Sequence, residues 1–134
     1  MMTAHIPSLH NPLNLPYSHG AAWLGLDARE PQRCGLCHFV SESYGLRAAL
    51  LLLQSCLRRP ALRTPQQLAA HWHRNPAALP AYLSNLCRLT GLQPDTQLSA
   101  SLHLDRLVAA MARLESGLGL TPQQVAQARR RFGL

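Results

Sequence analysis

Residues 41–60 read SESYGLRAALLLLQSCLRRP, and this stretch decides the fold. Its apolar residues nearly encircle a helix axis, which is typical of a helix buried at the centre of a domain. Ser41 and Ser43 are both suitable N-caps, and Pro60 cannot continue a helix. We therefore predict a central, buried helix that ends near Arg58.

Two later segments share a helix start signal. The sequence Thr-Pro-Gln-Gln occurs at residues 64–67 and again at 121–124. Thr is a frequent N-cap, Pro suits the first helical position, and Gln three residues after the cap completes a capping box. We predict a short helix after each signal, ending near His73 and near Arg131.

Two more helices are predicted to end on glycine. One spans residues 80–89 and stops at Gly91, and the other spans 102–116 and stops at Gly117. Glycine readily adopts the left-handed conformation that closes a helix. The chain beyond residue 41 is therefore expected to hold about five helices.

The first 40 residues are rich in Pro and Gly and contain only short apolar runs. The runs at 21–26 and 35–40 are joined by the polar segment 27–33, a pattern typical of a β-hairpin with a long loop. We predict one mainly α domain of 134 residues. Its loop and hairpin lobe covers 1–40 and its helical lobe covers 41–134.

The composition indicates a folded, basic protein. Hydrophobic residues make up 47% of the chain and charged residues only 14%, which excludes a disordered tail. The formal charge is +7 and every cation is Arg, so a polyanionic partner is expected: nucleic acid, an acidic membrane surface or a bacterial cell wall. The longest apolar run, 46–57, contains Arg47 and Gln54 and is shorter than the roughly 20 residues of a membrane span. We predict no membrane span.

The four cysteines do not predict a cofactor. Residues 34–38 read CGLCH, the attachment pattern of c-type haem. That chemistry requires export, and the N-terminus lacks the charged start and apolar core of a Sec signal. For zinc the same segment offers three ligands with His19 as a distant fourth, and no second paired motif follows. We predict neither cofactor nor metal, and leave open a disulfide between the two cysteines of this segment.

Glu115 is the leading candidate for a chemical role. It is one of six acidic residues and stands in RLESGLG, residues 113–119, at the predicted end of a helix. A carboxyl group flanked by apolar residues at such a boundary is placed to be partly desolvated and to hold a proton near neutral pH. The alternative interpretation is a solvated surface residue in a last helical turn.

The Glu-Ser-Gly run at 115–117 resembles the segment that carries the catalytic acid of lysozyme-like glycosidases, including lytic transglycosylases and bacterial glucosaminidases. In those enzymes the acid ends a helix near the beginning of the domain, and a small β lobe follows it. Here the order is reversed.

A second resemblance covers residues 8–119. The stretches 10–18, 23–25 and 39–48 are similar to a phage and prophage family. Its members begin with Asn-Pro-Gly-Asn-Ile-Arg, continue through a Phe and a Gly-Ile-Arg-Ala motif, and end on a helix bearing Glu-Asn-Gly. They are often labelled virion structural proteins.

This chain departs from that family's motifs at three positions. Leu13 and Pro16 replace the Gly and Arg of the opening motif. Ser116 replaces the Asn after the acid, which makes the segment more like ordinary lysozymes. The backbone of the opening turn is therefore expected to differ from that of the family.

Together the resemblances imply a circularly permuted lysozyme-like domain. Joining residue 119 and the last helix to residue 8 restores the order of acid helix, Asn-rich turn, β lobe and core helix. The implied function is a peptidoglycan-cleaving glycosidase of muramidase, glucosaminidase or lytic transglycosylase type, of phage or prophage-like origin. Made in the bacterial cytoplasm without a Sec signal, it would act in the periplasm or cell wall after delivery by a phage tail or secretion machinery, or within a virion.

In that function Glu115 would be the general acid that protonates the glycosidic oxygen. A hydrolase also needs a second carboxylate about 5 to 9.5 Å away. Glu30 or Asp27, on the predicted hairpin loop, are the candidates, and the sequence does not separate them. Glu42 is a weaker one, because the favourable effect of a negative charge at a helix N-terminus is the better explanation for it. A lytic transglycosylase needs no second carboxylate, and the choice between the reactions stays open.

Four residues are candidates for substrate binding. Asn11 and Asn14 are expected either to hydrogen-bond the acid or a sugar amide, or to shape a turn around Pro12. Tyr17 and Tyr44 are candidates to stack on sugar rings, with a core anchor as the alternative for Tyr44.

Two competing functions remain. One is a non-catalytic virion or tail component with a lysozyme-like fold. The other, less favoured, is nucleic-acid binding, suggested by Arg129–Arg131, although cations are also favoured at any helix C-terminus. His71 and His73 flank Trp72 and do not share a helix face, so we predict no metal site or functional role for them.

Overall fold

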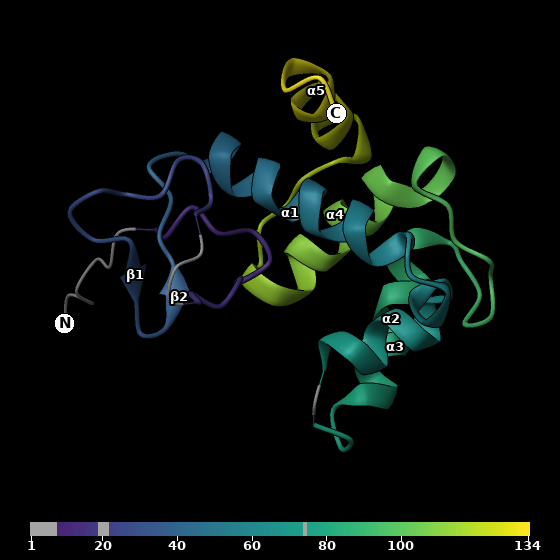
Figure 1. The fold of residues 1–134 in the computed structure, drawn as a ribbon. Helices are drawn as coiled ribbons and strands as arrows, with labels where there is room; N and C mark the ends of the chain where they lie inside the picture. Colours follow the sequence, from purple (N-terminus) through teal and green to yellow (C-terminus); the bar gives the residue numbers. More distant parts are fainter. Residues whose placement is uncertain (1–7, 19–21, 74) are drawn as a thin grey trace, which may run out of the picture.

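The computed structural model describes residues 8–18, 22–73 and 75–134. Two short strands precede the helices, and the elements follow in this order: β1 (Gln32–Arg33), β2 (Leu36–Cys37), α1 (Glu42–Leu57), a 3₁₀ turn η1 (Pro60–Leu62), α2 (Pro65–Trp72), α3 (Leu79–Thr90), α4 (Ala100–Ser116) and α5 (Pro122–Arg131). The predicted mainly helical domain with a small N-terminal hairpin is confirmed. The hairpin lies at one end of α1, and α2 and α3 lie toward the other end (Figure 1).

Helices α1 and α4 share the centre of the core. Leu50 and Leu53 of α1 and Leu107 and Met111 of α4 are fully buried. Helix α4 packs against α1, α3 and α5. Helix α1 is therefore central and buried, as predicted. Helix α4 is equally central, which the sequence pattern did not indicate.

The helix ends follow their local sequence signals. Thr64 and Thr121 each accept a hydrogen bond of 3.1 Å from the backbone amide three residues later. Ser41 caps α1 through the backbone amide of Tyr44. Gly91 and Gly117 close α3 and α4 in the left-handed conformation, with φ of 74° and 75°. These boundaries are confirmed because capping depends on neighbours in sequence.

The strands of the hairpin differ from the prediction. β1 and β2 pair antiparallel through a tight turn at Cys34 and Gly35, whose φ angles are 52° and 82°. β1 therefore lies inside the segment predicted to be a loop, and the predicted strand at 21–26 is wrong apart from one bridge between Leu26 and Phe39. Residue 21 lies outside the described residues. Two consecutive residues with positive φ form the tight two-residue turn that is favoured in hairpins. The strands therefore begin directly on either side of Cys34 and Gly35, and no long loop separates them.

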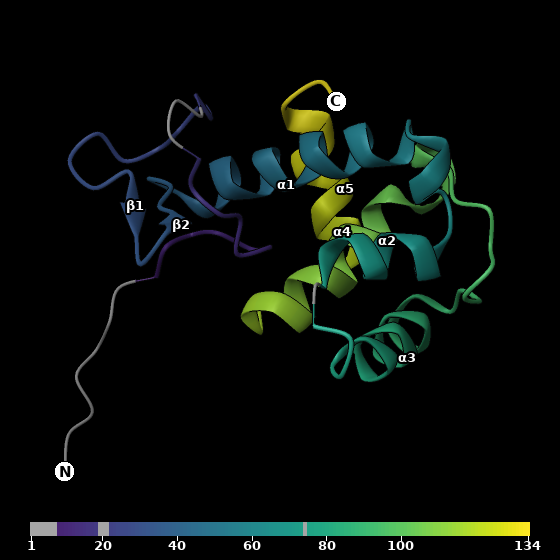
Figure 2. The same ribbon diagram turned by 60° about the horizontal axis from the view of Figure 1, so that its bottom comes forward.

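The N-terminal segment, residues 8–17, connects the hairpin lobe to the end of α4. The side-chain amide of Asn14 donates a hydrogen bond of 2.6 Å to the backbone carbonyl of Glu115. The hydroxyl of Ser116 donates one of 2.8 Å to the carbonyl of Pro12. Figure 2 shows this segment, in purple, reaching the C-terminal end of α4. The N-terminal segment is therefore joined directly to the C-terminal end of α4, more than 100 residues away in the sequence.

Candidate functional site

Glu115 lies in the last turn of α4 and is largely buried. Its side chain is 16% exposed. The carboxyl oxygen Oε1 is buried and has no hydrogen-bond partner among the described residues. Glu115 is therefore not the solvated surface residue of the alternative interpretation.

A surface cavity of about 580 Å³ opens beside this carboxyl group. We call it the Glu115 cavity. Its walls come from the N-terminal segment, from Leu52 of α1 and from the end of α2. The lining residues are Leu13, Asn14, Leu15, Pro16, Leu52, His71, Trp72, His73 and Glu115. The cavity thus lies where the hairpin lobe meets the helical lobe, and most of its wall is apolar.

The surroundings of Glu115 act on its pKa in opposite directions. Burial raises the pKa of the carboxyl group, while the charge of His73 and the hydroxyl of Tyr82 lower it, and burial is the larger effect. The pKa of Glu115 is therefore above the ordinary value for a glutamate. A raised pKa is what a carboxyl group needs to carry a proton as a general acid near neutral pH.

His73 and Tyr82 complete the polar part of the site. Nε2 of His73 lies 3.7 Å from Oε1 of Glu115. The His73 ring also packs on the Tyr82 ring, with centroids 4.1 Å apart. Burial and the nearby Glu115 raise the pKa of Tyr82, so its hydroxyl stays protonated. That hydroxyl is close enough to act on the carboxyl group, yet it has no partner in hydrogen-bonding geometry within the described structure.

The sequence reasoning missed both residues. His73 was judged only against partners on its own helix, whereas its partner stands at the end of α4. Tyr82 is one of several large residues on an amphipathic helix, and no local signal marks it. A carboxyl group in an apolar setting needs polar neighbours from somewhere, but the sequence does not say which element supplies them.

The two asparagines have separate roles. Asn11 is buried: its amide donates to the carbonyls of Leu15 and Cys37 and its oxygen accepts from the Leu15 amide. The turn interpretation of Asn11 therefore holds, and its amide has no hydrogen left for a sugar. Asn14 hydrogen-bonds the backbone of Glu115 and lines the cavity, so it holds the helix end in place without touching the carboxyl group.

The candidates for a second carboxylate lie elsewhere. Asp27 accepts hydrogen bonds from the backbone amides of Glu30 and Arg29, which lower the pKa of its carboxyl group. Glu30 pairs with Arg33 and lies 3.2 Å from His38. None of the three, Glu42 included, is among the residues that line the Glu115 cavity.

Glu42 begins α1, as expected of a charge that favours a helix N-terminus. It borders a separate cavity of about 290 Å³ beside the N-terminal segment and residues 116–118. Asn14 lines both cavities. The described structure therefore brings one carboxyl group, that of Glu115, into the Glu115 cavity.

The tyrosines proposed for stacking do not line the Glu115 cavity. The Tyr44 ring packs on Phe132, with centroids 5.9 Å apart, and it also lies against Gly25. Tyr44 is therefore the core anchor of the alternative interpretation. Tyr17 is half-buried against the core. Trp72 is the aromatic residue that lines this cavity.

The described part of the chain has no group of three or more His, Cys, Asp or Glu side chains placed to hold a metal ion. Cys34 and Cys37 are free thiols, and His19 lies outside the described residues. Among the described helices, none has the length and apolarity to cross a membrane.

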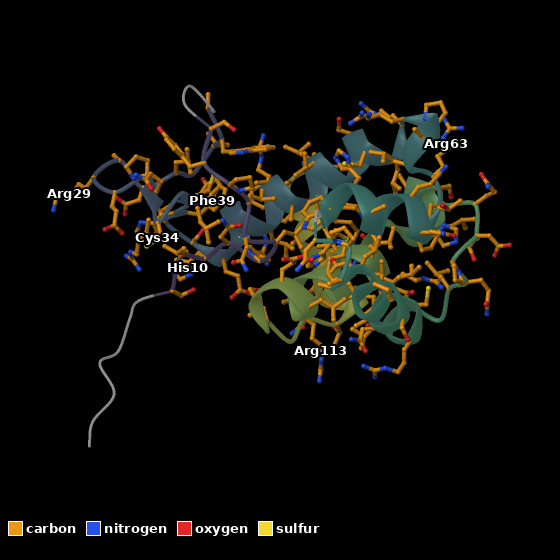
Figure 3. All side chains as sticks on the ribbon, turned by 90° about the horizontal axis from the view of Figure 1, so that it is seen from below. His10, Arg29, Cys34, Phe39, Arg63 and Arg113 are labelled. Atoms are coloured by element: carbon orange, nitrogen blue, oxygen red, sulfur yellow. The ribbon has the colours of Figure 1, made fainter. Side chains whose placement is uncertain are left out.

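Several arginines of the described structure lie far apart or are engaged in ion pairs. Arg29, Arg63 and Arg113 point outward at well-separated places (Figure 3). Arg129 makes a double hydrogen bond with Asp105, at 2.9 and 3.1 Å, and so leaves the C-terminal arginine run partly engaged. This arrangement gives no specific support to the nucleic-acid alternative.

Comparison with known proteins does not identify the chain. No protein-family model matches it, and no curated protein matches its sequence. Function is therefore argued from Glu115 and the residues around it.

Proposed function

We propose that this protein is a peptidoglycan-cleaving glycosidase in which Glu115 is the general acid. The observation that carries the proposal is a buried carboxyl oxygen at the wall of an open cavity, for which the described residues provide no hydrogen-bond partner. Leaving such a group unpaired costs about 1–3 kcal/mol, and a helix end does not require it. A desolvated titratable group in a cavity is a frequent mark of a catalytic site.

In this mechanism a glycan strand lies in the Glu115 cavity with its bridging oxygen near the carboxyl group. Glu115 gives its proton to that oxygen as the C–O bond breaks, and positive charge develops on the sugar ring. Trp72, Leu13 and Pro16 offer apolar surface to the sugar faces and limit the access of water. The carboxyl group of Glu115 leaves the step as a carboxylate.

The surroundings of Glu115 favour a reaction that uses a single carboxyl group. No second carboxylate is among the residues that line this cavity in the described structure. In a lytic transglycosylase a hydroxyl of the same sugar replaces water as the nucleophile, and its proton returns to Glu115. Of the reactions that the sequence left open, we propose this one.

The contact between the N-terminal segment and α4 supports a permuted lysozyme-like arrangement. A permuted domain requires the Asn-rich turn to start beside the acid helix, and the hydrogen bonds from Asn14 and Ser116 fulfil that requirement. The charge of +7 suits a wall rich in carboxylates and phosphates. The phage or prophage origin and the delivery by a tail or secretion machinery remain proposals that rest on the sequence motifs.

The test is release of soluble glycan fragments from purified cell walls by the wild type and by E115Q. We expect the substitution to lower the rate at least 10²-fold, since general acid catalysis contributes about 10² to 10⁴. E42Q is the matched control and should keep its activity, because Glu42 lies at the start of α1. Products of transglycosylation weigh one water molecule less than products of hydrolysis.

Equal release by the wild type and E115Q, or no release by either, would contradict the proposal. The non-catalytic virion component would then be the better interpretation. Circular dichroism of each variant confirms that a loss of activity does not come from unfolding.

A further inference from the structure

We propose that His73 is the positioning residue of this site: its imidazole, 3.7 Å from Oε1 of Glu115, orients the carboxyl group and, when protonated, stabilises its carboxylate form. The inference rests on the proposed role of Glu115 and deepens it by naming the residue that controls the acid. The sequence predicted no role for His73.

His73 is held where it can act on Glu115. It caps the C-terminus of α2, and its backbone amide donates to the carbonyl of Ala69 at 2.8 Å. Its ring rests on Tyr82, which is itself buried in α3. The imidazole therefore has support from two helices while it faces the end of a third.

The short distance between His73 and Glu115 excludes one other role for His73, that of a base that activates water. A base that activates water in an inverting glycosidase stands about 6.5–9.5 Å from the acid, on the opposite face of the sugar. A nitrogen 3.7 Å from Oε1 is on the same side as the acid. His73 therefore acts through Glu115.

Burial and His73 act on the Glu115 carboxyl group in opposite directions. A protonated imidazole stabilises the carboxylate, whereas burial stabilises the neutral carboxyl group. When Glu115 gives its proton to the leaving oxygen, the new carboxylate faces His73, and a protonated imidazole stabilises it. His73 thus makes the proton easier to release than burial alone would allow.

Few other titratable groups face this pair. Tyr82 approaches it from α3, and His71 of α2 lines the same cavity from a more exposed position. No arginine lines the cavity within residues 8–18, 22–73 and 75–134. Among the described groups, the cation that acts on Glu115 is therefore His73.

The experiment is an NMR titration of the glutamate side chains, labelled with ¹³C at the carboxyl carbon. The chain contains three glutamates, Glu30, Glu42 and Glu115, so E115Q assigns the signal of interest. We expect H73Q to move the Glu115 titration to higher pH, because the charge of His73 lowers the pKa of Glu115. H71Q, the matched control from the same helix and cavity, should leave it unchanged. H73K restores a cation and should move the titration back to lower pH than in H73Q.

The direction of the shift separates this proposal from a merely structural role. If Gln at position 73 only loosened the site, water would reach Glu115 and its titration would move to lower pH. A fall, or no change, would overturn the proposal, and so would an H73K titration that matches H73Q. The titration needs no substrate, so it is independent of the cell-wall assay. Suppose that the Glu115 titration moves to higher pH in H73Q while the wild type releases no glycan fragments. The interaction between His73 and Glu115 would then stand, and only the glycosidase proposal would be overturned.

Discussion

Glu115 carries an energetic cost that its position in the helix does not explain. A glutamate in the last turn of α4 could extend into water, yet its side chain turns toward the cavity and leaves Oε1 without a hydrogen-bond partner among the described residues. Strained or unpaired groups of this kind persist where function needs them. The cost should therefore be measurable as a gain in stability when the charge is removed.

We expect E115Q to be more stable than the wild type at neutral pH, by up to about 1–3 kcal/mol. The folded-state pKa of Glu115 is raised, so the folded chain binds more protons than the unfolded chain between the unfolded pKa, about 4.3, and the raised value. The stability that protonated Glu115 provides is fully present below the unfolded pKa and is lost as pH rises through the raised pKa. The gain in E115Q should therefore disappear below about pH 4. Urea unfolding at several pH values measures it.

Glu42 provides the control for this measurement. It stands at the first position of α1, where a negative charge stabilises the helix, so E42Q should cost about 0.3–1 kcal/mol at neutral pH. Equal effects of E115Q and E42Q would contradict the special position of Glu115.

The sequence predicted part of this site. Glu115 was found because a scarce acid stood at a helix end with apolar neighbours, and all of that information is local. His73 was missed because its proximity to Glu115 depends on how α2 packs near the end of α4. Asn14 was placed near the acid through the family resemblance, but its contact with the Glu115 backbone is a matter of loop geometry. Neighbours across helices are set by packing and not by sequence spacing.

At the scale of elements, Gly45 decides how the N-terminal segment crosses α1. A Cβ atom at Gly45 would lie 1.8 Å from the backbone oxygen of His10, and the Pro12 ring is also close. These are backbone and ring atoms with little freedom to move. The absence of a side chain in the first turns of α1 therefore lets the segment reach the end of α4.

We expect G45A to destabilise the protein. In an exposed helix the change would stabilise by about 1 kcal/mol, because alanine favours helices more than glycine does. Here overpacking against His10 costs about 1–3 kcal/mol or more and reverses the sign. G119A is the matched control, since a Cβ there meets nothing within 4 Å, and it should change the stability by less than about 0.5 kcal/mol. Urea unfolding followed by circular dichroism compares the two, and a stabilised G45A would contradict the crossing.

Elements were predictable where their signals were local. The Thr-Pro-Gln-Gln starts and the glycine stops gave α2, α3, α4 and α5 to within a few residues. The hairpin was less predictable because Cys34, a residue other than glycine, adopts a left-handed conformation with φ of 52°. A cysteine side chain does not indicate that conformation in a sequence. The connection between the strands was therefore predicted at residues 27–33, before its actual position.

At the scale of the whole molecule, the lobes depend on contacts between distant parts of the chain. Residues 8–14 lie beside residues 116–118 around one cavity. The connection between α3 and α4, in contrast, runs through the exposed residues 93–95. Non-covalent contacts therefore hold residues 8–14 beside the end of α4, whereas the covalent connection between α3 and α4 is exposed.

We expect a permuted chain that restores that order to fold. It would begin at Asp95, run through α4 and α5, continue through a Gly/Ser linker of about 15 residues to Ser8, and end at Pro94. Such a linker has a root-mean-square reach of roughly 20 Å. The hydrogen bonds of Asn14 and Ser116 at the helix end would be kept, because both partners remain. Loop entropy changes slowly with length, so the stability should fall by no more than about 2 kcal/mol.

Circular dichroism and urea unfolding test this permuted chain against one opened between Leu50 and Leu51, inside the buried helix α1. The second chain should not fold cooperatively, because its new ends would separate residues of the core. If the chain that begins at Asp95 also fails to fold cooperatively, the permuted lysozyme-like arrangement loses its support. If it folds and shows the Glu115-dependent release of glycan fragments that we propose for the wild type, the order of the lobes does not matter for that proposed reaction. The spatial arrangement of Glu115, His73 and the N-terminal segment would then be sufficient for the proposed reaction.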